Sequence, residues 1–427
     1  MVTNADDRTG TVGDLAHRAD MPNASPGFVA AFVAAVLGVS VATLTPLTVT
    51  LAVRIKQITP GHEAANLSLV LGVAAVVALL SGPFFGQLSD RTTSRWGMRR
   101  PWLIGGLAVG LGGLAVLATA TTITMVLLGW CVTQIGFSAL NAALAALLID
   151  HVPDGQRGKV SGLIGMCQAL GVVIGVFLVQ AVRSSVALMF VVPGAVAAAA
   201  VLVLVVMLHD RRLAREARGR YDLREFARSF WVNPIRHPGF GWAWLSRFLM
   251  ITGFAILQTY QVYYLSDHLG FSTDRVPGLV FESILVLTVT IVVSSNVCGW
   301  LSDRLRRRKY FVVASAALYS LSMLVVATAH TWNTFLVGMV IGGLGLGAYL
   351  AIDLALVAQV LPDGGANAAK DLGVFNIANS VPQMVAPAIA PVFLAIGSGS
   401  NYTALFIGAA GFSVLGALAI QPIRGVR

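Results

Sequence analysis

Charged side chains are scarce in this sequence of 427 residues, because Asp, Glu, Lys and Arg together supply only 11% of it. Soluble domains usually carry about 25% charged residues, so the composition excludes that class. Hydrophobic residues supply 56%. The sequence therefore predicts an all-α polytopic membrane protein whose surroundings are the lipid bilayer.

Cysteine and histidine are also sparse. The three cysteines, Cys131, Cys167 and Cys298, lie within apolar runs, where a small buried thiol is ordinary, and they predict no disulfide framework. The seven histidines lie in loops or at predicted helix ends, and no set of ligands resembles a metal site. No nucleophile with a nearby base stands out either. We therefore expect no enzyme, no metal and no cofactor.

The net charge of +10 does not indicate a nucleic-acid-binding protein, because the arginines are scattered among loops rather than gathered on one surface. The first 24 residues are polar and acidic, and they lack the basic start and apolar stretch of a cleaved signal peptide. We expect residues 1–24 to form a disordered cytoplasmic tail.

Apolar runs of roughly 20 residues are long enough to cross the ~30 Å of hydrocarbon in a bilayer. Such runs divide into six before the longest polar stretch and six after it. They are predicted at 26–53, 64–88, 101–121, 123–149, 157–182, 185–208, 241–266, 277–301, 309–329, 332–358, 372–396 and 401–421.

The positive residues predict the orientation. Of the 29 lysines and arginines, Arg247 lies within a predicted span, and Arg54, Lys56, Arg183 and Arg275 lie in odd-numbered loops. All the others lie in the termini or the even-numbered loops. Because positive residues concentrate on the cytoplasmic side, we expect both termini in the cytoplasm and the protein in the cell (plasma) membrane.

Two markers recur after about 210 residues, a period that halves the chain. G-Q-L-S-D-R begins at Gly86 and returns as G-W-L-S-D-R at Gly299, and the Pro-Asp-Gly of 153–155 returns at 362–364. The predicted organisation follows from this repeat. It comprises a tail at 1–24, a six-helix bundle at 25–208, a linker at 209–240, a second six-helix bundle at 241–421 and a cytoplasmic tail at 422–427.

The linker and one glycine run have two interpretations each. Arginines alternate with apolar residues in 209–240, which favours an amphipathic helix on the anionic cytoplasmic leaflet over a plain solvated tether. The run G-G-L-G-L-G at 342–347 resembles a phosphate loop but has no strand before it. We expect close helix packing there, because small residues let backbones approach.

The repeated motif resembles the signature loop between the second and third helices of the major facilitator superfamily, and its second copy resembles the counterpart between the eighth and ninth helices. In that family the loop is thought to be a cytoplasmic latch in which the aspartate accepts from a helix N-terminus or a basic partner. The resemblance assigns to this latch Gly86, Asp90, Arg91, Arg95, Gly97, Arg99, Arg100, Gly299, Asp303 and Arg304. Arg157 resembles the family's further basic partner, with Asp150 as its carboxylate.

A finer resemblance is to sugar porters. Residues 89–102 and 371–383 are similar to stretches of the glycoside-pentoside-hexuronide cation symporters and plant sucrose transporters, in which arginine would be usual at Met98. The sodium-coupled members carry two membrane aspartates in the second helix, whereas 67–82 holds only aliphatic and small residues here. The resemblance thus implies sugar transport without sodium coupling.

Aromatic and amide side chains at helical spacing predict substrate-binding faces, because amides match sugar hydroxyls and aromatic rings stack on a pyranose. The alternative is that each polar group only bonds a neighbouring helix. The fourth span contributes one face, the seventh another, and the fifth, tenth and eleventh spans contribute further positions. The candidate residues are Trp130, Gln134, Phe137, Asn141, Phe254, Gln258, Gln261, Gln168, Tyr349, Asn376, Asn379 and Gln383.

Ionisable groups inside spans are costly and therefore informative. Arg247 and Asp353 lie in the cytoplasmic third of the seventh and tenth spans and are able to pair, either as a static ion pair or as one that exchanges partners. Glu282 lies near the outer end of the eighth span. There it is either a partly buried proton carrier or a side chain that extends to the interface.

These features predict a secondary transporter that alternates access by rocking its two halves around a midplane site. The expected activity is proton-coupled uptake of a sugar or glycoside by a monomer. The alternative is a proton-driven exporter of drugs or other amphipathic molecules, since one fold serves both directions. A membrane sensor or receptor that binds a ligand without moving it is a third class, which a flux assay would distinguish.

Overall fold

The computed structural model describes residues 23–208, 210, 236–305, 308–357, 374–375, 377–397 and 400–423. Within those ranges the regular structure is helical, and 12 helical segments are long and apolar enough to cross a membrane. The predicted all-α fold with twelve spans is thereby confirmed. Most of the linker at 209–240, the tail at 1–22 and residues 424–427 lie outside the described residues, as does Asn376.

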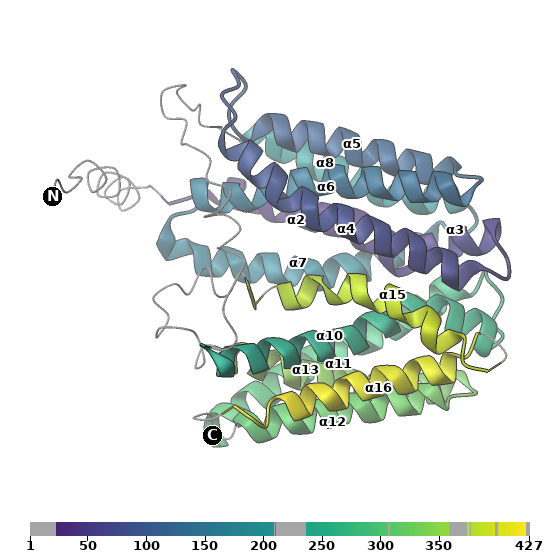
Figure 1. Cartoon of the computed structure of the whole chain (residues 1–427). Coiled ribbons are helices and arrows are strands. Elements are labelled where there is room, and N and C mark those ends of the chain that lie inside the picture. Colours follow the sequence, from purple (N-terminus) through teal and green to yellow (C-terminus); the bar gives the residue numbers. More distant parts are fainter. Residues whose placement is uncertain are drawn as a thin grey trace. The chain divides into compact units, whose positions relative to one another are not determined.

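Figure 1 traces the helices of the described residues along the chain. In chain order they are α2 (Pro26–Thr45), η1 (Pro46–Thr50), α3 (Leu51–Ile58), α4 (Glu63–Asp90), α5 (Arg100–Thr119), α6 (Ile123–His151), α7 (Asp154–Ala181), α8 (Val186–Met207), α10 (Pro238–Tyr263), η3 (Tyr264–His268), α11 (Val276–Leu305), α12 (Arg308–Ala327), α13 (Trp332–Val357), α15 (Pro382–Leu394) and α16 (Tyr402–Ala419).

Side-chain caps fix where several helices begin. Ser25, Thr122, Ser185 and Asn401 each accept a hydrogen bond from a backbone N–H in the first turn of α2, α6, α8 and α16, respectively. The first N–H groups of a helix have no partner within it, so a short polar side chain at the cap stabilises the end. The sequence placed these helix starts within one residue.

The first span is longer than predicted. α2, the π-helical η1 and α3 run on as one span from Pro26 to Ile58. Arg54 and Lys56, which the sequence placed in the first loop, therefore lie in α3. The prediction ended too early because it stopped at the first charged side chain, although long basic side chains are tolerated near a helix end.

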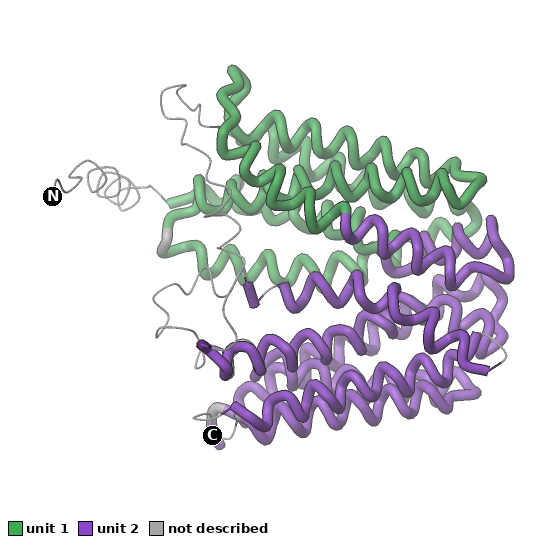
Figure 2. Tube along the Cα trace, in the orientation of Figure 1, with its two compact units in different colours: residues 1–46, 77–219 green, residues 47–76, 220–427 purple. Residues whose placement is uncertain are grey.

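Contacts divide the chain into two compact units (Figure 2). Unit 1 comprises residues 1–46 and 77–219, and unit 2 comprises 47–76 and 220–427. α3 and the first part of α4 therefore belong to unit 2, although both precede the linker. The first and second spans are shared between the units.

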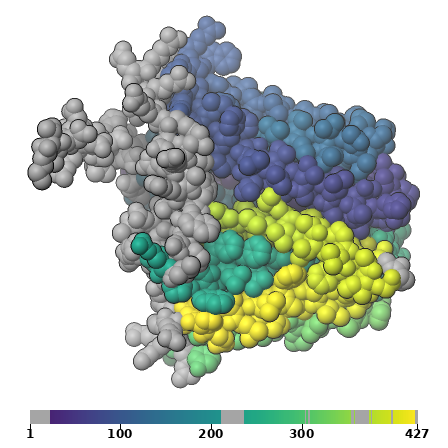
Figure 3. Space-filling model, viewed as in Figure 1, coloured from purple at the N-terminus to yellow at the C-terminus, as the bar shows by residue number. Residues whose placement is uncertain are grey.

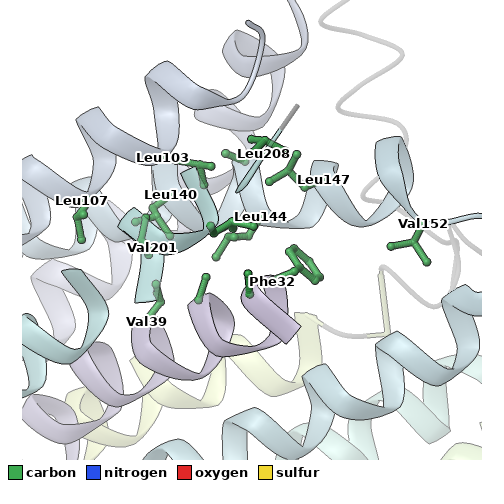
Figure 4. Packing of buried hydrophobic residues seen from close by; sticks show 14 of the residues in the cluster. Phe32, Val39, Leu103, Leu107, Leu140, Leu144, Leu147, Val152, Val201 and Leu208 are labelled. Carbon is green, nitrogen blue, oxygen red and sulfur yellow. The ribbon is translucent and has the colours of Figure 1, made fainter. Parts of the chain in front are cut away.

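The core of unit 1 is aliphatic. α5 packs along α6, and α2 packs against α7 and α8. Phe32, Leu103, Leu144 and Leu147 belong to one buried cluster (Figure 4). Glycine permits the closest approach, since a Cβ at Gly106 would lie 2.7 Å from a backbone oxygen of α6. Small residues bring membrane helices together in this way because dispersion contacts, rather than water exclusion, hold them.

Unit 2 is built on α12, α13 and α11, with α10 packed on α16 and with α15 lying along both of those helices (Figures 1 and 3). The glycine run at 342–347 faces two neighbours. A Cβ at Gly345 would meet the backbone of α12 at Tyr319, and one at Gly343 would meet α11 at Thr290. The prediction that this run serves helix packing is confirmed.

Candidate functional site

A buried ion pair joins α10 to α13 inside unit 2. Arg247 Nη1 donates to Asp353 Oδ2 at 2.5 Å. The side chain of Asp353 is 2% exposed and that of Arg247 13%. The sequence identified these two residues as able to pair, and the structure brings them together.

Further groups satisfy both charges. Arg247 Nε donates to Asn379 Oδ1 at 2.8 Å, and its guanidinium carbon lies 4.7 Å from the centre of the Phe375 ring. On the other side the hydroxyl of Tyr349 donates to the carboxylate of Asp353. We call Arg247, Asp353, Asn379, Tyr349 and Phe375 the charged cluster.

The charged cluster is neutral as a whole because its two charges cancel. A single charge in a low-dielectric interior is costly, whereas a paired and hydrogen-bonded one is tolerated. Adding a proton to Asp353 would remove the partner of Arg247 and leave a guanidinium held only by an amide and an aromatic ring. The stability of the charged cluster therefore depends on both members of the pair, since losing either charge would leave the other uncompensated in the interior.

Sequence reasoning recovered only part of this cluster. Asn379 and Tyr349 were assigned to substrate binding, but in the structure both bond to members of the ion pair. Phe375 was missed. It lies four residues before Asn379, and that spacing would have placed it on the same helical face.

The predicted face of the fourth span, on α6, divides into two parts. Trp130 and Phe137 are each 1% exposed, and a Cβ on Gly110 of α5 would touch the Phe137 ring. Gln134 is half-buried and Asn141 is exposed. Phe137 is thus a packing residue between α5 and α6, and the four side chains do not line one surface of unit 1.

The other predicted polar positions are also distributed unevenly. On α10, Phe254 and Gln258 are half-buried, whereas Gln261 is 1% exposed and its amide nitrogen has no hydrogen-bond partner among the described residues. Gln168 on α7 is exposed, and Gln383 on α15 is half-buried. α10 therefore carries amides that extend from the charged cluster toward its other end.

Glu282 lies in α11, near its beginning, and its side chain is exposed on the surface of the helix bundle. Of the two interpretations given for this carboxyl, exposure is what the one that extends to the interface expects. The helix at this point presents one face to the core and one away from it. Ser283 and Ile284 occupy the buried side.

Arg99 organises a second polar cluster, in unit 1. Its Nη1 donates to Asp90 at 2.7 Å and to Ser89 at 2.8 Å, and its Nε donates to Asp150 at 2.9 Å. Burial lowers the pKa of the guanidinium, but the carboxylates of Asp150 and Asp90 outweigh that effect, so the pKa is raised above its ordinary value. The sequence paired Asp150 with Arg157. Asp150 accepts from Arg99, and Arg157, which has a further interaction of its own, donates to the carbonyl of Val152.

Asp210 is a member of this cluster that the sequence analysis missed. Its Oδ2 accepts from the backbone N–H groups of Arg99 at 2.7 Å and of Arg100 at 2.8 Å, at the beginning of α5. A carboxylate is stabilising at a helix N-terminus because it satisfies unpaired amides and opposes the helix dipole. The motif resemblance expected an aspartate in this role, and Asp210 at the end of the sixth span fills it.

The remaining latch residues differ in how they are placed. Arg100 donates to the carbonyl of Leu208, whereas Arg95 is exposed. Gly86 has open space where a Cβ would stand. In the second copy, a Cβ at Gly299 would make only ordinary contact with α13, and Arg304 lies over the ring of Trp300 at 5.4 Å. The side chain of Asp303 lies outside the described residues, and Arg91 has interaction partners of its own.

Gly97→Ala is expected to destabilise unit 1. Gly97 has a φ of +105°, and an added Cβ would overlap the carboxylate of Asp210. A side chain in this backbone region costs about 1–3 kcal/mol, and displacement of Asp210 adds the loss of the helix cap. A thermal unfolding scan in detergent should show a fall of several degrees. Gly82→Ala, with open space around its Cβ, is the control, and an equal fall in both would contradict this account.

The chain matches a family model described as Major Facilitator Superfamily over residues 27–295 and 283–425. A solved structure, that of a D-xylose-proton symporter, superposes with a TM-score of 0.69 at 16% identity, covering 94% of this chain and 99% of that one. At that identity the likeness shows the fold alone.

Curated relatives match over short stretches. An MFS-type efflux transporter, pyiT of Pyricularia grisea, is 36% identical over 97 residues, which are 22% of this chain and 15% of the relative. The arabinose-proton symporter of Bacillus subtilis (strain 168) is 31% identical over 113 residues, 25% of this chain and 24% of the relative. The chain thus spans no more than about a quarter of the length of either relative.

Proposed function

Because this chain belongs to the major facilitator superfamily of transporters, we propose that it carries a sugar or glycoside into the cell together with a proton. Its family, together with the 12 helical segments of the described residues that are long and apolar enough to cross a membrane, makes it a secondary transporter. The finer proposal adds the substrate class, the coupling ion and the direction. The buried pair of Arg247 and Asp353 is the observation that carries it.

The pair supports proton coupling through its energetics. Asp353 is a carboxylate in a span, and its neutralisation by a proton is the least costly way to break its bond to Arg247. The freed guanidinium keeps Asn379 as its acceptor at 2.8 Å. Protonation of Asp353 thus replaces the ion pair by a neutral carboxyl group within one buried site. This change alters the contacts between α10 and α13. Helix contacts that change with proton occupancy are what a coupled transporter requires.

The amides on α10 support the sugar assignment. Gln258 and Gln261 offer both donors and acceptors, which match hydroxyl groups, and Gln261 holds a buried amide nitrogen without a partner among the described residues. A sugar hydroxyl would satisfy that donor. The names of the arabinose-proton and D-xylose-proton symporters are consistent with this substrate class.

Export of amphipathic molecules is the second candidate. The burial of Trp130 and Phe137 within unit 1 removes two ring faces on which a sugar would stack. The pyiT relative is named as an efflux transporter. An exporter would use the charged cluster for proton antiport instead of symport.

The protein is proposed to act as a monomer in the plasma membrane with both termini cytoplasmic, in agreement with the distribution of its basic residues. The cluster around Arg99 is proposed to be a cytoplasmic latch whose ion pairs break and reform during transport. Its three side-chain bonds to Ser89, Asp90 and Asp150 support that role.

The test is uptake of labelled mono- and disaccharides into proteoliposomes. An inward proton gradient should drive at least one sugar to accumulate, whereas a sodium gradient alone should not. Empty liposomes and a gradient collapsed by a protonophore are the controls. Accumulation that requires sodium, or no flux of any sugar, would overturn the proposal. Proton-driven movement of amphipathic cations in the same vesicles would favour the exporter.

A further inference from the structure

Polar contacts fasten α3 and the start of α4 to α10, η3 and α16 within unit 2. The ammonium of Lys56 donates to Ser266 Oγ at 2.6 Å and to the carboxylate of Asp267. The other oxygen of Asp267 accepts from the hydroxyl of Tyr402 at 3.1 Å. Asp267 is thus shared by a side chain from the first span and one from the last. We call these four residues the Lys56 lock.

Two buried tyrosines of α10 extend the same attachment. The hydroxyl of Tyr260 lies 2.6 Å from Ser68 Oγ on α4, and that of Tyr263 donates to the carbonyl of Ala52 on α3 at 3.1 Å. Both tyrosines are 0% exposed. Lys56 and Asp267 are, in contrast, 22% and 24% exposed. The ion pair is therefore the most exposed part of the attachment, and partly exposed pairs are weak.

The other part of the first span is held inside unit 1. A Cβ at Gly38 on α2 would lie 3.1 Å from Ala197 on α8, and one at Gly171 on α7 would lie 2.7 Å from the side chain of Ser40. At both positions the helices lie so close together that α2 has no room to slide along α7 or α8. α2 is therefore fixed by close packing, whereas α3 is fixed by hydrogen bonds and one ion pair.

A π-helical turn separates the two parts. η1 spans Pro46–Thr50, and the boundary between the units falls after Pro46. Proline has no N–H and removes a helical hydrogen bond, and a π turn replaces the regular ladder with a wider one. Sharp helix bends occur at such positions. The span is weakest at the point where its attachment changes from one unit to the other.

From this arrangement we propose that η1 is a hinge and that the Lys56 lock is its release. When Lys56 leaves Asp267, α3 swings away from α10 while α2 stays packed on α7 and α8. The first span then bends within itself rather than moving as one rod with its half of the chain. This inference does not depend on which substrate or ion the protein carries.

The experiment measures exposure of Ala52, which is 3% exposed beneath the lock. Cys131, Cys167 and Cys298 are replaced by serine, Ala52→Cys is introduced, and the rate of maleimide labelling is followed in lipid nanodiscs, where both faces are accessible. Lys56→Gln should raise the rate roughly threefold, the size expected for loss of a weak ion pair. The exchange Lys56→Asp with Asp267→Lys should return the rate to its original value.

Further variants make the test specific. Lys159→Gln, at an exposed lysine of α7, is the matched control and should leave the rate unchanged. Tyr402→Phe, which removes one bond to Asp267, should raise the rate less than Lys56→Gln does. Pro46→Ala restores the missing N–H and should reduce the effect of Lys56→Gln.

The proposal is overturned if Lys56→Gln in a monodisperse sample leaves the labelling unchanged, if Lys159→Gln acts equally, or if the charge exchange fails to restore the rate. Because no transport is measured, these outcomes are independent of the proposed activity.

Discussion

Asp353→Asn is expected to abolish accumulation driven by a proton gradient, lowering it roughly tenfold or more, while exchange of labelled for unlabelled substrate continues. An amide takes the place of the carboxylate and still accepts a hydrogen bond from Arg247, but it does not bind a proton near neutral pH. The Asp353 side chain is 2% exposed, so no water replaces the lost charge. Proteoliposome uptake and exchange, measured on the same preparation, check this expectation.

A double variant separates coupling from folding. Asp353→Asn leaves the guanidinium of Arg247 uncompensated in the interior, and breaking a buried pair from one side costs about 3–5 kcal/mol. Adding Arg247→Gln removes that unpaired charge and should restore thermal stability. It should not restore proton-driven accumulation. If accumulation returns together with stability, the ion pair has only a structural role.

Gly106→Val is expected to disrupt the packing of α5 on α6 in unit 1. An added Cβ would lie 2.7 Å from the carbonyl oxygen of Gly136 and 2.8 Å from the backbone nitrogen of Leu140. Backbone atoms do not move aside as a flexible side chain does, so α5 and α6 would have to separate. Overpacking of this kind costs about 1–3 kcal/mol or more. The change should lower the unfolding temperature in detergent and reduce the yield of folded protein.

The neighbouring residue supplies the control. Gly105 lies on the same helix with open space around its Cβ position. Gly105→Val carries the same change in helix propensity and hydrophobicity but meets no neighbour. It should therefore unfold within a degree or two of the parent protein. Similar losses in both variants would show that propensity, not packing against α6, explains the effect.

The spans were predictable because hydrocarbon imposes a strict condition on length and polarity. Where the prediction was wrong, at Arg54 and Lys56, the helix continues past its first charges, and Lys56 finds its partner beyond the sequence window. Asp267, the partner of Lys56, lies more than 200 residues along the chain. Contacts at such a separation leave no periodic pattern in the sequence.

The candidate sites were predictable where an ionisable side chain lies inside a span, and their other members were not. Arg247 and Asp353 stood out because ionisable groups in spans are rare. Phe375 and Asp210 did not stand out, since an aromatic ring or a loop aspartate is ordinary in composition. Their roles follow from three-dimensional proximity, as when Asp210 meets the first amides of α5. The four residues of the α6 face differ in burial, because spacing places residues on one side of a helix without saying which neighbour covers that side.

The central claim is that a proton and a sugar move together through the charged cluster. The most direct measurement is the pH of a lightly buffered medium around proteoliposomes when sugar is added without any imposed gradient. The account predicts alkalinisation of the medium by the parent protein, with sugar entering at a constant ratio to protons, and no pH change with Asp353→Asn. Sugar entry by the parent protein without proton movement, or an unchanged pH response in Asp353→Asn, would contradict it.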